Sequence, residues 1–234
     1  MGLKMKGVWF GNLHSYENFG LILSETIISS PKIKTKQIKV PGMDGVIDLT
    51  EFDGNIHYYN RTIKFVFSKD RVSEYWNSIR SEINNKIHGK EMDIIMDEDA
   101  GFIWHGRVNV KEQKKDGRVG TIEIEVDAAP YKQNRFTSIE EGEWDTFDLQ
   151  TGIMQCLKDL EINGKTQIEV FGYRQNVVPV IHSEGTVSLI CNDIPIALDE
   201  GKNKFLNVVI KEGKNILLFE GTGIVSIEFR GGSL

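Results

Sequence analysis

Alternation of apolar and polar residues is the dominant pattern along the chain. Ile63, Phe65 and Phe67 lie on one face of an extended segment, and the residues between them lie on the other. The same alternation runs through 122–127, where the second face carries three acidic residues. A period of two over a short run is typical of a strand that is buried on one side. The sequence therefore predicts a mainly β protein.

One helix is predicted, over about 70–88. Its apolar residues recur at spacings of three and four: Val72, Tyr75, Trp76, Ile79, Ile83 and Ile87. Ser68 or Asp70 is expected to cap its start, and Gly89 supplies the residue that ends it. A single apolar stripe of this kind packs on a sheet. A groove-binding or membrane-surface helix is disfavoured, because the polar face carries both signs of charge.

Short strands and turns fill the rest of the first half. Residues 7–30 are expected to form two short strands about a turn, through the segments 8–10, 11–15 and 21–23, with a polar loop at 16–20. After Met92 the chain returns to strands, which end at the run Ala128-Ala129-Pro130-Tyr131-Lys132. The helix and these strands predict an N-terminal β-sandwich with one packed α-helix.

Two tight turns are predicted within six residues. Pro41 fixes its own φ for the first corner, Gly42 takes the positive φ of a type II turn, and Asp44-Gly45 is a second turn signal. The segment before them carries Lys32, Lys34 and Lys36 on one face of an extended chain. We interpret it as a solvated edge strand rather than a binding stripe, because edge lysines block unwanted strand pairing.

The second half differs in the spacing of its apolar runs. Short apolar runs are separated by Gly, Asn and Asp turns at intervals of about eight to twelve residues, which is typical of an antiparallel sandwich. The runs are 168–171, 177–181, 187–191, 194–198, 205–210, 216–219 and 224–229, and the turns are 192–193, 212–215 and 221–223. Residues 133–143 are polar with no sustained period. We therefore expect a domain at 1–132, a linker at 133–144 and a β-sandwich domain at 145–234.

Composition narrows the class of protein. The chain has 234 residues, of which 40% are hydrophobic and 26% charged, and its longest apolar runs fall far short of the roughly 20 residues of a membrane span. A soluble protein is expected, and no secretion signal is visible at the N-terminus. The net charge of −6 argues against broad binding to nucleic acid. Cys156 and Cys191 are expected to be free thiols in a reducing cytoplasm.

No complete catalytic, cofactor or metal site is predicted. Asp97-Glu98-Asp99 is the best metal candidate, but it lacks the distal ligands of a calcium loop, so a plain acidic hairpin is favoured. The five histidines are scattered singly, and the glycines at 221 and 223 do not open a helix as a dinucleotide site would. Exposed aromatic residues for sugar stacking are few: Trp144, Phe171 and Tyr173. Core packing is the favoured explanation for the last two.

The first 132 residues contain a series of small motifs in a particular order. The motifs are Ser15-Tyr16, Phe19-Gly20-Leu21, Pro31, the Pro41-Gly42-x-Asp44-Gly45 turn with Asp48, Tyr59-Asn60-Arg61 before the 63–67 strand, the helix ending at Gly89, Gly106-Arg107 and Pro130-Tyr131. This order resembles the N-terminal domain of the distal tail (Dit) proteins of siphophages, the long-tailed phages, of Gram-positive hosts. The remainder of the chain is similar only in being a small β domain.

The resemblance implies a structural protein of the virion tail tip, made in the bacterial host cytoplasm. In that family the N-terminal domains close into a hexameric ring, through which DNA passes, and the C-terminal domain is galectin-like. The implied partners are the tail-tube protein on one side and the tail-associated lysin or tail fibre and receptor-binding proteins on the other. No enzyme activity, membrane contact or cofactor is implied.

Assembly residues are expected where the resemblance is tightest: Pro41, Gly42, Asp44, Gly45, Asp48 and Arg61. A simpler interpretation of Asp48 and Arg61 is an ordinary surface ion pair. The alternative function is a carbohydrate-binding module or a cell-wall-acting accessory protein, in which the second domain does the work.

Overall fold

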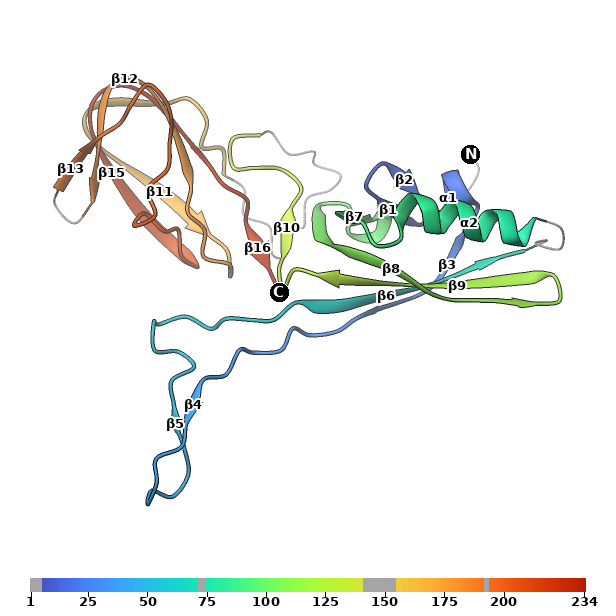
Figure 1. Ribbon diagram of the computed structural model, residues 1–234. Helices are drawn as coiled ribbons and strands as arrows, with labels where there is room; N and C mark the ends of the chain where they lie inside the picture. The colour runs from blue at the N-terminus through green and yellow to red at the C-terminus, as the bar shows by residue number, and fades with distance from the viewer. Residues whose placement is uncertain (1–5, 71–74, 141–154, 192–193) are drawn as a thin grey trace. The chain divides into compact units, whose positions relative to one another are not determined.

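The chain forms two compact units in a computed structural model (Figure 1), which describes residues 6–70, 75–140, 155–191 and 194–234. The first unit contains the residues up to Glu98 together with Trp104–Pro130 and Leu234. The second contains Asp99–Ile103 and Tyr131–Ser233. Both units are built mainly from antiparallel strands, which confirms the predicted fold class.

An antiparallel sheet organises the first unit, in the order β2-β1-β7-β8-β9-β6-β3. Its strands are β1 (Val8–Phe10), β2 (Leu13–His14), β3 (Ile22–Ile28), β6 (Arg61–Lys69), β7 (Glu91–Met96), β8 (Phe102–Asp116) and β9 (Val119–Ala128). The longest unbroken register in this sheet joins β6 to β9, from Arg61 opposite Ala128 to Lys69 opposite Gly120. The two segments with the clearest alternation in the sequence are therefore neighbours at the centre of the fold.

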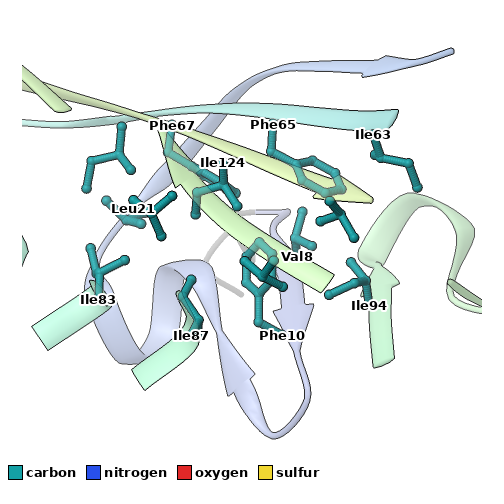
Figure 2. Packing of buried hydrophobic residues seen from close by; sticks show 14 of the residues in the cluster. Val8, Phe10, Leu21, Ile63, Phe65, Phe67, Ile83, Ile87, Ile94 and Ile124 are labelled. Carbon is teal, nitrogen blue, oxygen red and sulfur yellow. The ribbon is translucent and has the colours of Figure 1, made fainter. Parts of the chain in front are cut away.

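The core of the first unit lies on one face of β6 and β9. Ile63, Phe65 and Phe67 are completely buried, and the Phe10 ring on β1 lies 6.0 Å from the Phe65 ring. Figure 2 shows these rings pointing toward one another, with Ile83 and other aliphatic side chains closing the cluster. The alternation in the sequence therefore predicts burial correctly here, because the opposite faces of these strands are polar except at Val66.

Helix α2 (Trp76–Ile87) packs on this core through Trp76, Ile83 and Ile87. The helix and its stop are confirmed, since Gly89 has a φ of 75°. The predicted cap is wrong: Ser68 lies in β6, and Tyr75 occupies the N-cap position without a side-chain hydrogen bond. Residues 71–74, over which the helix was also expected, lie outside the described residues.

A second helix corrects the polar loop that was expected at 16–20. Helix α1 (Ser15–Phe19) begins after His14, whose ring Nδ1 accepts a hydrogen bond from the backbone N–H of Glu17. It ends at Gly20, with a φ of 62°. Five residues are too few to show a helical period in the sequence, so the pattern does not predict this helix. The structure shows it through the cap that the buried His14 provides.

The second unit contains a sheet of order β11-β15-β12-β13, with β14 also paired to β12. Its strands are β11 (Leu160–Gly172), β12 (Val180–Cys191), β13 (Ile194–Ala197), β14 (Gly201–Asn203) and β15 (Gly213–Glu228). Strands β10 (Lys132–Asn134) and β16 (Gly232–Ser233) pair with each other, so the predicted linker begins inside a strand. Val170, Phe219 and Ile227 are fully buried at the centre of a separate core.

Three predicted elements of this unit are wrong. The expected turn at 221–223 lies inside β15, which runs unbroken from Gly213 to Glu228, and all of the expected turn at 212–215 except Glu212 falls on the start of the same strand. A Cβ atom on Gly221 would lie 2.1 Å from the carbonyl oxygen of Thr186 on β12, so this glycine permits a close approach between strands. The run 205–210 forms no strand, and its one bridge joins Ile210 to Val177. The turn expected at 192–193 lies outside the described residues.

Candidate assembly arm

Residues 29–60 leave the first unit's sheet between β3 and β6 and return to it as a doubled segment, which we call the arm (Figure 1). The two legs are joined at intervals by backbone hydrogen bonds, including Tyr59 N to Lys32 O and Leu49 N to Lys36 O, both 2.8 Å long. Near the far end, β4 (Gln37–Ile38) pairs with β5 (Ile47–Asp48). The arm is thus an extended hairpin with a short ladder at its distal end.

Apolar side chains are exposed along the whole arm. None of residues 29–60, all of which the structure describes, is buried. Eight large apolar residues are more than a third exposed: Ile33, Ile38, Val40, Met43, Val46, Ile47, Phe52 and Tyr59. An isolated two-stranded hairpin is marginally stable, and a contiguous exposed apolar surface commonly marks an interface. The arm is therefore the strongest candidate functional site of the molecule.

The tip of the arm has the turn geometry that the sequence predicts. Gly42 has a φ of 82° and Gly45 a φ of 81°, and the backbone N–H of Met43 donates to the carbonyl of Val40. Both glycines occupy the left-handed region, where other residues are strained. The turns are confirmed, whereas an assembly role for Pro41, Gly42, Asp44 and Gly45 stays a prediction.

Lysines of the outgoing leg lie over aromatic rings of the returning leg. The Nζ atom of Lys34 is 5.4 Å from the centre of the Tyr59 ring, and that of Lys36 is 4.8 Å from the centre of the Phe52 ring. Cation–π contacts of this kind contribute about 0.5–1 kcal/mol at exposed sites. The two legs therefore support each other through side chains as well as backbone.

Arg61 is buried at the root of the arm, which its charge did not indicate in the sequence. Only 8% of the residue is exposed, and its Nε donates to Ser29 O at 2.6 Å. Its Nη1 donates to Pro130 O at 3.3 Å, and its guanidinium lies 5.0 Å from the Trp104 ring centre. Burial lowers the pKa of Arg61 from its ordinary value. This one side chain ties together both strands that border the arm and the end of β9.

Asp48 lies near the opposite end of the arm, so the interpretation of Asp48 and Arg61 as an ion pair is wrong. Its Oδ1 accepts a hydrogen bond from the backbone N–H of Thr50 at 2.8 Å. Hydrogen bonds from the Thr50 side chain and then from this N–H hold the pKa of Asp48 below its usual range. Ser29 completes the root, since its hydroxyl accepts from Thr62 N at 3.0 Å. Sequence reasoning missed Ser29 and Trp104, because neither stands in a recognisable motif.

The acidic run that was the best metal candidate is a short 3-10 helix, η1 (Asp97–Asp99). The Asp97 carboxylate accepts from Gly7 N at 2.9 Å and Trp9 Nε1 at 3.1 Å, and its Oδ2 lies 3.1 Å from Nε2 of the buried His14. Among the described residues, no three acidic, histidine or cysteine side chains are grouped to hold a metal ion. The Asp97 carboxylate thus makes hydrogen bonds that hold β1, β2 and the start of helix α1 in place.

The aromatic residues considered for sugar stacking do not share one environment. Phe171 is 42% exposed on β11. The Tyr173 ring lies against Gly231, where an added Cβ would be 2.0 Å from the ring. Trp144 lies outside the described residues. Packing therefore accounts for Tyr173, and of the two residues that the structure describes Phe171 presents the exposed ring.

Comparison with known proteins supports the fold. No protein-family model matches the chain, and no curated protein matches it. The solved structure of the Dit protein of phage SPP1 matches with a TM-score of 0.66 and 11% sequence identity, covering 99% of this chain and 100% of that one. That structure is described as a paradigm of the hub adsorption apparatus in phages that infect Gram-positive hosts. The predicted resemblance to Dit proteins is confirmed at the level of the fold.

Neither of the α-helices in the described part of the chain has the length and hydrophobicity of a membrane-spanning helix.

Proposed function

We propose that this chain is a structural hub protein at the distal end of a phage tail. The observation that carries the proposal is the fold match over 99% of this chain and 100% of the SPP1 Dit protein. A single β-sandwich is a common scaffold with many functions, so a match to one unit would say little. A match that includes both units, in one chain of the same extent, is far more specific.

The proposed hub is a six-membered ring that connects the tail tube to the host-adsorption apparatus. The tail-tube protein would bind one face, and the tail-associated lysin or fibre and the receptor-binding proteins would bind the other. DNA would pass through without sequence-specific contacts, in keeping with the net charge of −6. This role is structural and uses no catalytic group or cofactor.

The exposed arm supports ring formation by the N-terminal part, residues 1–132. A cyclic ring repeats one head-to-tail interface, which needs two complementary patches on the same domain. The arm supplies one patch of exposed apolar residues that its own unit leaves uncovered. Residues 145–234 are proposed to be an independent sandwich that stays monomeric by itself.

The alternative is a carbohydrate-binding protein, and the observation that favours it is the exposed Phe171 ring. A glycan array probed with the intact chain separates the two. Binding that is lost in Phe171→Ala would favour the carbohydrate-binding module, whereas no glycan binding leaves the hub as the better account.

Native mass spectrometry of the intact chain tests the ring. We expect a six-copy particle of about 160 kDa, six times the 26.6 kDa chain, either alone or on addition of the tail-tube protein. A monomer under both conditions would contradict the proposed ring.

A further inference from the structure

We propose that, in the assembled ring, the arm of one copy docks on the β8–β9 hairpin of the next copy. This inference rests on the ring proposed above and names the two surfaces that form its repeated contact. The occupant of the hairpin surface is therefore a second copy of this chain.

The two surfaces lie at opposite ends of one sheet. The arm joins the sheet at Arg61, which pairs with Ala128, whereas the hairpin begins beyond Gly120, which pairs with Lys69. The nine residue pairs from one end to the other span about 27 Å at the rise of a strand. Figure 1 shows the arm and the β8–β9 hairpin at the two ends of β6 and β9. A head-to-tail interface needs its two patches on different sides of one subunit, and this placement provides them.

The returning leg of the arm is acidic. From Val40 to Asn60 the chain contains four carboxylates and neither Lys nor Arg. The carboxylates, Asp44, Asp48, Glu51 and Asp53, belong to exposed residues. Phe52, 71% exposed, stands between two of them. The outgoing leg carries the lysines, so the negative charge is a property of the returning leg and not of the arm as a whole.

The hairpin end carries the opposite charge around an apolar centre. Between residues 111 and 118 there are four basic residues and two acidic ones, and Lys114, Lys115 and Arg118 are exposed. Val119 is 44% exposed and stands between Arg118 and Gly120 on the sheet face opposite to the one where Gly120 meets the Trp76 ring.

The chemistry of the two surfaces is complementary. Phe52 lies between two carboxylates along the returning leg, and Val119 follows a segment with a net positive charge, so the two segments carry net charges of opposite sign. Apolar contact at the centre contributes affinity, while opposite charges at the rim fix the register and speed association. The buried Arg61 root supports this contact because it holds the arm in place where it leaves the sheet.

A charge-swap experiment on the intact chain tests the contact by sedimentation velocity over a range of concentrations. The hairpin variant is Lys115→Glu with Arg118→Glu, and the arm variant is Asp44→Lys with Glu51→Lys. Each should raise the dissociation constant of the assembly by at least about tenfold, because reversal replaces attraction by repulsion. The chain that carries all four changes should assemble at least tenfold better than either variant.

The control is Lys202→Glu with Lys204→Glu, on exposed residues of the second unit. It changes the net charge by the same amount as the hairpin variant. This variant should assemble like the unmodified chain. If the unmodified chain assembles but the hairpin variant does so equally well, or the fourfold variant recovers nothing, the arm–hairpin contact is wrong and the ring stands. If the unmodified chain is monomeric throughout, with and without the tail-tube protein, the ring fails and the contact fails with it.

Discussion

Replacing Arg61 by alanine should loosen the root of the arm and destabilise the first unit. The change removes the donors to Ser29 O and Pro130 O and the guanidinium over the Trp104 ring. A hydrogen bond from a charged donor contributes about 1.5–3 kcal/mol, and the ring contact about 0.5–1 kcal/mol. The gross loss is therefore about 3.5–7 kcal/mol. Burying the cation has its own desolvation cost, which the alanine variant escapes, so we expect a net loss of about 2 kcal/mol.

Urea unfolding followed by tryptophan fluorescence measures this loss, and a shift of the midpoint by about 1 M corresponds to it. Arg61→Lys should recover only part of the stability, because an ammonium group cannot stack flat on the ring while it serves two separate carbonyl groups. The matched control is Arg107→Ala, which removes an arginine whose side chain is 54% exposed and paired with Glu91. It should cost under about 1 kcal/mol. An Arg61→Ala chain as stable as this control would refute the reasoning.

Three further predictions concern residues outside the arm. Hydrogen bonds that the His105 ring donates to the Asp93 and then the Glu91 carboxylate raise the pKa of His105, so its stabilising contribution is fully present below the unfolded pKa near 6.5 and is lost as pH rises through the folded value. Urea titrations at several pH values should show this slope, and His105→Gln should abolish it. Asp97→Ala leaves three donor groups without their acceptor and should cost about 2–4 kcal/mol by urea unfolding; a loss below 1 kcal/mol would show that water replaces them. Gly221→Ala should destabilise the second unit by at least about 2 kcal/mol more than Gly213→Ala in thermal melts, because both have positive φ but only the first places its Cβ against a neighbouring strand; equal losses would mean that φ alone matters.

The sequence predicts the elements whose periodicity is strong and whose burial is one-sided. Strand β6 and helix α2 were predicted because their apolar residues fall on one face, and that face meets the core. Helix α1 was missed because a five-residue helix contains little more than one turn. Strand β15 was divided because Gly221 was read as a turn, whereas it serves a close approach between strands.

The candidate site was predicted in part, for a related reason. The turns at the tip of the arm follow from local residue chemistry, and Gly42 and Gly45 take the expected conformation. The length of the arm and its lack of buried residues could not be predicted. They arise because residues 29–60 do not pack against the core of the unit, and local sequence patterns do not encode that. Arg61 was expected at the surface because charged residues are rarely buried, and its burial depends on carbonyl groups far away in sequence.

The central claim is that this protein is a hub at the distal end of a phage tail. Electron microscopy of the particles that contain it, labelled with an antibody raised against the intact chain, tests the claim most directly. The account predicts label at the tail end farthest from the head, with an averaged view that shows a ring of six copies around a channel. Label along the tube or on the head, or particles that contain none of this chain, would contradict it.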